Sequence, residues 1–324
     1  MDRKNVTDHS SGNMKIVRNI DDVVVDPLSI VTIGTFDGVH LGHQAILRYA
    51  VKQAKAISGI SRMITFHPHP RDVVGKGPVE HLCTIEERLH LFESQGIDET
   101  LVVNFTHAFS QITARSFYEQ YIVRRIGVYE VVIGHDHQFG RNREGSIETL
   151  QKLGAELNFS VVVIPGVSVD GQVVSSSLIR RCLLAGEIED ATKYLGKPYS
   201  ITAKVVEGDK RGRSIGFPTA NLYYDSTLKL TPASGVYVAS VVVDGKQYYG
   251  MVNIGVRPTF TTNGHRLVEV HILDFEGDLY GKTITVAFIK RLRREQKFNS
   301  VDDLVAQLQH DRLDSRKIVS SIIH

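Results

Sequence analysis

The chain has few cysteines, little net charge and no long apolar run in its 324 residues. Its two cysteines, Cys83 and Cys182, form neither a CxxC pair nor a metal-ligand spacing. The sequence therefore offers no disulfide framework and is typical of reduced thiols in a cytosol. No apolar run reaches the roughly 18 residues that a membrane span needs, and the N-terminus lacks the apolar core of a signal peptide. We expect a cytoplasmic protein with no membrane partner.

The charges nearly cancel, because 38 Lys and Arg residues face 36 Asp and Glu residues, for a net charge of +2. A general nucleic-acid binder usually shows a stronger basic excess, so we expect no nucleic-acid partner. The one dense basic run, from Lys290 to Lys297, is either a solvated strand end or a phosphate-facing patch. We expect a monomer or a weak homo-oligomer.

The length allows two domains, each with its own core. Residues 1–13 are polar without periodicity and are expected to be a disordered leader. From about Ser29 to Leu195, short β-branched runs alternate with helical patterns, and Thr84 with Glu87 forms a capping-box signature at the start of one of these helices. These runs are apolar throughout, as strands buried on both faces by crossover helices should be. The first domain, 14–195, is therefore predicted to be a doubly wound, Rossmann-like α/β domain that binds its ligand at the carboxyl ends of the strands. The runs are SIVTIG, SRMITF, ETLVVNF, YEVVIG and FSVVVIP.

After Leu195 to Tyr199 the strands are separated by turns rather than helices. Asp244-Gly245 lies between two of them and is a strong signal for a short hairpin. A helix closes the chain, with Ser300 as its expected cap. Residues 196–324 are therefore predicted to form a small antiparallel β-barrel with a terminal helix. The strand segments are ITAKVVEG, GVYVASVVV, QYYGMVNIG, RLVEVHILDF and KTITVAFI.

The segment GTFDGVHLGH, from Gly34 to His43, follows a buried strand and runs into a helix. Its glycines let the backbone approach phosphates closely, and a helix N-terminus favours an anion. His40 and His43 lie on one face and could stabilise the charge that develops at an α-phosphate as pyrophosphate leaves. The same spacing is compatible with histidines that only cap the helix. A zinc site is disfavoured, because no third ligand is clustered nearby.

The segment GDKRGRSIGFPTAN, from Gly208 to Asn221, is a second candidate site. Its glycines and basic residues suit a flexible arch around a polyphosphate, although a solvated basic turn has the same composition. Thr219 and Asn221 offer two neutral oxygen ligands on the same side of an extended strand, which suits Mg²⁺. The residues of the arch are Gly208, Lys210, Gly212, Arg213 and Gly216.

The segment RLVEVHILDF alternates apolar and polar residues, which puts Glu269 on the polar face of its strand. From this pattern alone, Glu269 is an ordinary solvent-facing carboxylate.

GTFDGVHLGH resembles the phosphate-binding motif of the HIGH-type nucleotidyltransferases. The whole chain from about Met14 resembles the bacterial bifunctional riboflavin kinase/FAD synthetase family, because the family's motifs occur here in order. Besides the segments above, these motifs are TFHPHP (Thr65 to Pro70), IGHDHQFGRNREG (Ile133 to Gly145), SSSLIRR (Ser175 to Arg181), LGKPY and LYGK.

For the first domain, the resemblance implies adenylyl transfer from ATP to FMN, with His40 and His43 holding the ATP phosphates. Ser177 stands where the family usually has threonine, while His67 and His137 stand where it more often has an acid and an aromatic residue. The nucleotide contacts implied are Gly34, Phe36, Asp37, Gly38, Asp136, Ser176, Ser177 and Arg180.

For the second domain, the resemblance implies a riboflavin kinase in which Thr219 and Asn221 hold Mg²⁺ and Glu269 accepts the proton of the ribityl hydroxyl. The glycine arch would then hold ATP. The expected ligands are ATP and Mg²⁺, with riboflavin, FMN and FAD as substrates and products. Two alternatives are an enzyme whose adenylyltransferase half is inactive and a flavin-binding regulator without turnover.

Overall fold

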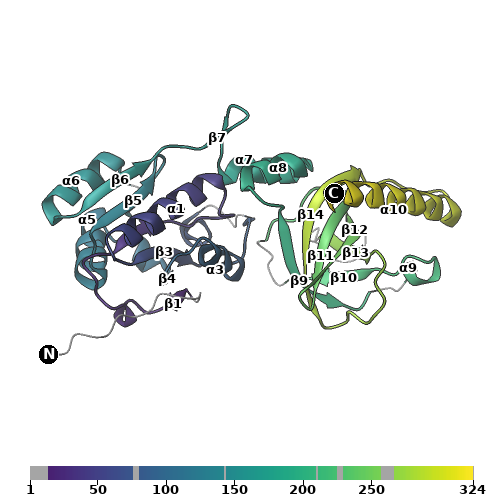
Figure 1. Ribbon diagram of the computed structural model, residues 1–324, viewed down its shortest axis with the longest axis horizontal. Helices are drawn as coiled ribbons and strands as arrows, with labels where there is room; N and C mark the ends of the chain where they lie inside the picture. The colour runs from purple at the N-terminus through teal and green to yellow at the C-terminus, as the bar shows by residue number, and fades with distance from the viewer. Residues whose placement is uncertain are drawn as a thin grey trace. The chain divides into compact units, whose positions relative to one another are not determined.

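The computed structural model describes residues 14–75, 80–141, 144–208, 211–224, 229–256 and 266–323. It divides into two compact units, one ending at Val174 and the other beginning at Ser175 (Figure 1). The division falls before α7 (Ser176–Ala185) and α8 (Ile188–Leu195), whereas the boundary predicted from the sequence follows them. Lys210 of the predicted arch lies outside the described residues.

The first unit is built on a six-stranded parallel sheet with the order β1-β4-β3-β2-β5-β6. The five predicted runs form β2 to β6, which confirms the predicted parallel sheet. An edge strand, β1, was not predicted, because three residues carry no readable pattern. The strands are β1 (Lys15–Val17), β2 (Ile30–Ile33), β3 (Ser61–His67), β4 (Glu99–Asn104), β5 (Glu130–Gly134) and β6 (Ser160–Ile164).

Helices cover both faces of this sheet. Successive residues of β5 belong to opposite cores: Val131 and Ile133 pack with the π-helix η2 and α6, and Val132 packs with α1 and α3. The predicted capping box opens α3, since the Thr84 hydroxyl accepts from the Glu87 amide at 3.2 Å and the Glu87 carboxylate accepts from the Thr84 amide at 3.0 Å. The helices are η1 (Ile20–Asp22), α1 (Leu41–Ala56), α2 (Pro70–Val74), α3 (Ile85–Ser94), α4 (His107–Ser110), α5 (Ala114–Phe117), η2 (Tyr118–Ile126) and α6 (Ile147–Leu157). A small hairpin, β7 (Ser168–Val169) and β8 (Gln172–Val173), completes the unit.

The second unit is a closed antiparallel barrel with the order β10-β13-β12-β11-β14-β9, as predicted. Asp244 and Gly245 have φ values of 47° and 76° and form the two-residue turn between β11 and β12. The strands are β9 (Ser200–Val206), β10 (Ala220–Tyr223), β11 (Gly235–Val243), β12 (Lys246–Val256), β13 (Arg266–Ile272) and β14 (Thr283–Arg293), and a short helix, α9 (Arg211–Ser214), precedes β10.

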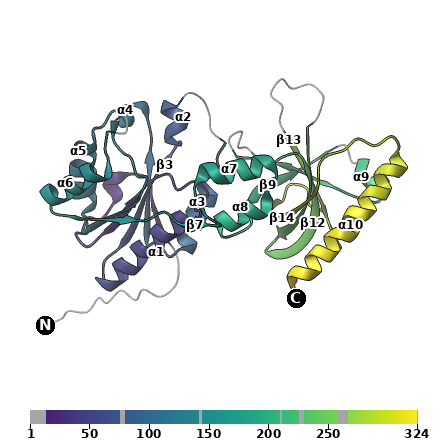
Figure 2. The same ribbon diagram turned by 90° about the horizontal axis from the view of Figure 1, so that it is seen from above.

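Helices α7, α8 and α10 (Val301–Ile323) pack on the outside of the barrel (Figure 2). Arg291 of β14 donates to the Ala185 carbonyl at the end of α7 at 3.1 Å. At the other helix, the buried Asp311 carboxylate of α10 accepts from Arg293 of β14 at 2.8 Å. Ser300 caps α10 as predicted, with its hydroxyl accepting from the Asp303 amide at 3.1 Å.

Candidate functional sites

The first candidate site lies where the strand order of the parallel sheet reverses. β2 is flanked by β3 and β5, and its chain continues into the segment from Gly34 to His43. The carboxyl end of β5 continues into Asp136. A Cβ atom at Gly134 would lie 3.2 Å from the Asp136 carboxylate and 3.3 Å from Ile46 of α1. Asp136 is therefore folded back over the end of β5 next to α1, at the switch point that holds ligands in open α/β sheets.

The backbone of this loop is held in an unusual conformation. Phe36, Gly38 and Val39 have φ values of 49°, 82° and 43°, and the Phe36 and Val39 side chains are buried in the core. Positive φ is costly for residues other than glycine and persists only where the surrounding structure enforces it. The loop is therefore shaped by its anchoring rather than by local preference.

Asp37 is one of these anchors. Its carboxylate is buried and accepts from the backbone amides of Leu82 at 2.9 Å and Cys83 at 3.1 Å. The Gly38 amide in turn donates to the Cys83 sulfur at 3.1 Å. Asp37 thus ties the loop to the segment that leads into α3, and its direct contact with the nucleotide stays a prediction.

His40 and His43 lie at the start of α1 with their rings stacked, the centroids 3.6 Å apart. His40 is the N-cap of α1, because its Nδ1 accepts from the His43 amide at 3.3 Å, so the capping interpretation holds for His40. Burial, and then the charges of His40 and Arg88, hold the pKa of His43 well below its ordinary value of 6.5. His43 is therefore neutral at pH 7, and its enclosed Nδ1 has no hydrogen-bond partner among the residues that the structure describes.

The other histidines of this unit divide between turns and interior. His67 and His135 are exposed. His69 caps α2 by accepting from the Arg71 amide at 3.1 Å. His137 stacks on Phe139 and its Nε2 is buried without a partner, so burial lowers the pKa of His137 to about 4. His137 is thus a neutral, stacked ring at the position where the family more often has an aromatic residue.

The SSSLIRR segment forms the start of α7 in the second unit. Ser175 is the N-cap, since its hydroxyl accepts from the Leu178 amide at 3.3 Å. Ser176 and Ser177 are consequently the first two residues of the helix, and Arg180 lies one turn further on. These residues are at a helix N-terminus, as a phosphate contact requires, and their meeting with His40 and His43 stays a prediction.

The second candidate site is a row of polar residues across three strands of the barrel. Asn221 of β10 pairs with Glu269 of β13, which pairs on its other side with Asn253 of β12. Directly paired residues of antiparallel strands share a face, so the three side chains lie together, opposite the buried Val268 and Val270. The sequence analysis missed Asn253, although it is the one polar residue in the run Met251–Gly255.

The glycine arch packs against this row. A Cβ atom at Gly208 would lie 1.9 Å from the Asn221 amide nitrogen, and one at Gly212 would lie 3.4 Å from the Thr219 hydroxyl. Asn221 is buried, while Thr219, Arg213 and Gly216 are exposed and Glu269 is half-buried. The structure therefore brings Gly208, Thr219, Asn221 and Glu269 together.

Residues from β13 and α10 complete this region. His271 bonds through Nδ1 to the Pro218 carbonyl at 2.8 Å, and burial lowers its pKa. The Arg312 guanidinium of α10 lies 5.3 Å from the centre of the Phe217 ring. Both contacts hold the segment that carries Thr219 and Asn221.

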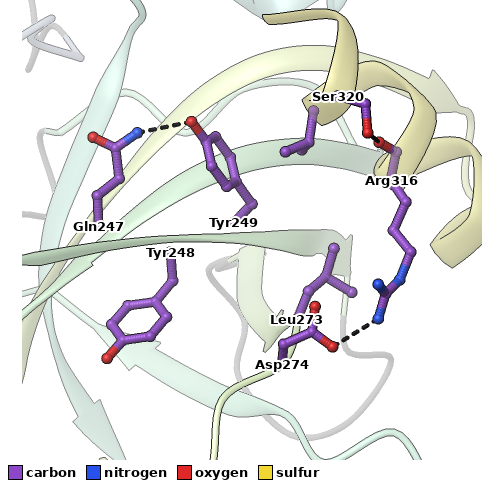
Figure 3. Close-up of a pocket in the computed structure, with 8 residues that line it drawn as sticks. Gln247, Tyr248, Tyr249, Leu273, Asp274, Arg316 and Ser320 are labelled. Carbon is purple, nitrogen blue, oxygen red and sulfur yellow. Dashed lines mark hydrogen bonds and ion pairs between the residues drawn. The ribbon is translucent and has the colours of Figure 1, made fainter. Parts of the chain in front are cut away.

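A pocket of about 330 Å³ opens further along the same strands, between the start of β12, the end of β13 and α10. Tyr248 and Tyr249 extend from opposite sides of their strand, and Asp274 bonds Arg316 of α10 at 2.7 Å (Figure 3). One of its lining residues, Asp274, follows Glu269 by five residues in the chain.

The described residues contain no group of three or more His, Cys, Asp and Glu side chains that could hold a metal ion. Within the same residues, no helix is long and apolar enough to cross a membrane. Both cysteines are buried thiols.

Comparisons with known proteins agree with this division into two sites. The family model for FAD synthetase matches residues 25–178, and the model for riboflavin kinase matches residues 195–319. The Bifunctional riboflavin kinase/FMN adenylyltransferase of Listeria monocytogenes is 37% identical over 299 residues, which cover 90% of this chain and 93% of that protein. The protein of the same name from Pseudomonas fluorescens is 34% identical over 312 residues, 96% of this chain and 100% of the relative.

A solved structure is similar over nearly the whole chain. It is 32% identical, has a TM-score of 0.85 and covers 94% of this chain and 98% of its own. Its title names a macrolide-efflux protein from Streptococcus pneumoniae, an activity that neither family model describes. This similarity therefore supports the two-unit fold of the chain and implies no activity.

Proposed function

Because the chain belongs to the family of bifunctional riboflavin kinase/FMN adenylyltransferases, it uses ATP both to phosphorylate riboflavin to FMN and to adenylylate FMN to FAD, and we propose which residues perform each step. Adenylyl transfer is assigned to the loop at the sheet's switch point, and phosphorylation to the row Asn221, Glu269 and Asn253. The observation that carries the assignment is this row, because the pairing of β10 with β13 places Glu269 beside Asn221.

In the adenylyl-transfer site, a phosphate oxygen of FMN attacks the α-phosphorus of ATP, and the bond to the β-phosphate oxygen breaks to release pyrophosphate. The imidazoles of His40 and His43 donate hydrogen bonds to the phosphate oxygens as charge develops there. The backbone of Gly34, Phe36 and Gly38 lines the phosphates. Asp37, Asp136, Ser176, Ser177 and Arg180 are proposed as the further nucleotide contacts.

In the kinase site, the oxygen of the ribityl 5′-hydroxyl attacks the γ-phosphorus of ATP, and ADP leaves. Glu269 accepts the proton of that hydroxyl as the new bond forms. A half-buried carboxylate between two amide side chains suits this role, because it is partly shielded yet reachable. Gly208, Lys210, Gly212, Arg213 and Gly216 are proposed to hold the ATP phosphates.

The oxygen donors of Thr219 and Asn221 fit Mg²⁺, which prefers oxygen ligands and shares its coordination with ATP phosphates. The Gly208 backbone packs on the Asn221 amide so closely that no Cβ atom fits, which fixes that side chain. When bound, Mg²⁺ would neutralise phosphate charge.

We propose domains at 14–195 and 196–324 after a leader at 1–13. The family model for riboflavin kinase begins at residue 195, which supports a boundary at this place. Two buried thiols and the absence of a membrane-spanning helix among the described residues support a cytoplasmic location. A near-zero net charge supports the lack of a nucleic-acid partner, and we propose a monomer or weak homo-oligomer.

Turnover of the purified chain with riboflavin, ATP and Mg²⁺ tests the assignment, with FMN and FAD quantified separately. We expect both flavins to appear and chelation of the metal to stop both reactions. FMN without FAD would indicate an inactive adenylyltransferase half, and neither product would indicate a flavin-binding regulator.

A further inference from the structure

Arg88 is a buried cation beneath the loop from Gly34 to His43. It lies in the first turns of α3, is 4% exposed, and donates through Nη1 to the Thr35 carbonyl at 2.5 Å and to the Thr65 hydroxyl at 3.3 Å. Its Nε is buried without a hydrogen-bond partner. In the described part of the chain, Arg88 forms no ion pair with a carboxylate.

Arg62 of β3, in the same unit, is a buried arginine with a structural role and serves as a comparison. It is 3% exposed, lies 3.1 Å from the buried Glu99 carboxylate, and donates to the Val24 and Ile126 carbonyls at 2.5 and 2.8 Å. A buried charge costs several kcal/mol unless a counter-charge and hydrogen bonds compensate it. Arg62 has both, whereas Arg88 has only neutral oxygens, so its charge is left available for an anion.

The contact between Arg88 and Thr35 also fixes the direction of a peptide group. In a trans peptide the C=O and the following N–H point in opposite directions. Because the Thr35 carbonyl points inward to Arg88, the Phe36 N–H points away from the core, at the carboxyl end of β2. Among the described residues this N–H has no hydrogen-bond acceptor, while the preceding Gly34 N–H donates to the Ile64 carbonyl at 3.0 Å.

The charge of Arg88 acts on two histidines, His43 and His69. It lowers the pKa of His43, after burial and His40, and it contributes to the lowered pKa of His69, which also faces His81, Asp37 and Asp72. A cation that disfavours protonation of His43 keeps that imidazole in its neutral form. The same positive potential attracts a polyphosphate to the loop.

We propose that Arg88 is a positioning residue for adenylyl transfer: it turns the Thr35–Phe36 peptide so that the Phe36 N–H meets a phosphate oxygen of ATP, and its unpaired charge complements the triphosphate. This inference rests on the proposed adenylyl-transfer site. Arg88 acts through the loop and through its field, without reaching the reacting atoms.

The test compares Arg88→Met, Arg88→Lys and the matched control Arg62→Lys. Each preparation is assayed for FAD formation from FMN over a range of ATP concentrations, for kinase turnover, and for its melting temperature. Loss of one preorganised donor costs on the order of 10²-fold, so we expect kcat/KM for ATP to fall by about that factor in Arg88→Met. Lysine keeps the charge but lacks the planar fork, so we expect Arg88→Lys to lose about tenfold. Kinase turnover should not change.

A titration of the His43 ring by NMR measures the pKa of His43 in each variant. A purely structural role of Arg88 would not change this pKa. Without the neighbouring cation, the pKa of His43 should rise in Arg88→Met, and it should stay close to that of the parent in Arg88→Lys. Arg62→Lys should lower the melting temperature with the adenylyl-transfer constants unchanged.

Parental kcat/KM in a folded Arg88→Met protein would overturn the inference, and so would an equal loss in Arg62→Lys. If Arg88→Met does not fold, Arg88→Lys provides the test. Parental adenylyl transfer in Arg88→Lys would then overturn the inference. A parent protein that makes FMN but no FAD would instead refute the adenylyl-transfer assignment, which the same assay shows directly.

Discussion

The two proposed sites are built by different structural means. In the first, the site is a backbone loop at the edge of a parallel sheet, with its anchors Asp37 and Arg88 buried and His43 neutral. In the second, the site is a row of side chains on the outer face of an antiparallel barrel, where Glu269 is half-buried and Thr219 is exposed. The first site would offer fixed N–H donors to the phosphates, whereas the row in the second would offer oxygen atoms to Mg²⁺ and to a proton.

The difference follows from the two kinds of sheet. Parallel strands bring their carboxyl ends to one edge, so a site there is made by the loops that follow. Antiparallel strands bring residues distant in sequence onto one face, as register does for Asn221 and Glu269. Since the sites share no described residue, substitutions should separate the two activities.

The largest effect is expected for Glu269→Gln, which keeps the size of the side chain but cannot accept a proton. Loss of a general base typically costs 10²–10⁴-fold, so FMN formation should fall by about that range. FAD formation from supplied FMN should not change, and the melting temperature should stay the same because Glu269 fills no core volume. The control Glu276→Gln, in the exposed turn after β13, should leave both reactions intact. Near-parental kinase turnover of Glu269→Gln would show that Glu269 is an ordinary strand carboxylate and not the base.

His43→Ala tests the other side of the comparison. Removing one donor to the developing charge should slow FAD formation by on the order of 10²–10³-fold, while FMN formation continues. The same change at His90, which is exposed on α3, serves as the control. If both activities fell together in His43→Ala, the histidines would be structural or the units coupled.

A smaller effect is expected for Gly208→Ala. The added methyl group would lie 1.9 Å from the Asn221 amide nitrogen, so the Asn221 side chain must move. A displacement of about 1 Å near a reacting group can cost up to about 10²-fold, and we expect a loss of 10- to 10²-fold in kinase kcat/KM. Adenylyl transfer by the same preparation is the internal control. An unchanged kinase would show that Asn221 is not held by the arch.

The smallest effect is on stability in acid. His137 has a pKa of about 4 in the folded chain against an ordinary 6.5. Between these values the unfolded chain binds a proton that the folded chain does not, so stability is lost as pH falls from 6.5 to 4. The loss at pH 5 is at most about 2 kcal/mol.

Chemical unfolding of His137→Phe and the parent at pH 7 and pH 5 measures this loss. The variant should lose less stability than the parent, while His107→Phe, at an exposed position, should behave as the parent does. Equal losses in parent and His137→Phe would show that His137 titrates normally when folded.

Local signals in the sequence predicted much of the fold. The capping box at Thr84 and Glu87, the turn at Asp244-Gly245 and the cap at Ser300 depend only on neighbouring residues, and all three are confirmed. The five buried strands of the first unit were readable because each is apolar on both faces.

Features that depend on distant contacts could not be predicted. Asn253 joins the kinase row through strand register, which no local pattern encodes. The Asp37 carboxylate accepts from the amides of Leu82 and Cys83, which lie 45 and 46 residues away in the chain. Arg88 has the sequence pattern of an ordinary charged helix residue, and only tertiary packing shows that it is buried with no carboxylate partner among the described residues.

The most direct test of separable sites is turnover by the isolated second unit, a fragment from Ser175 to His324. It retains α7 and α8, and in α7 the carbonyls of Ala185 and Leu183 accept from Arg291 of β14 and from the Ala233 amide before β11, at 3.1 and 3.0 Å. Given riboflavin, ATP and Mg²⁺, we predict that the folded fragment makes FMN at the rate of the full chain and makes no FAD. FAD formation by this fragment, or a folded fragment without kinase turnover, would contradict the division of the two activities between the two units.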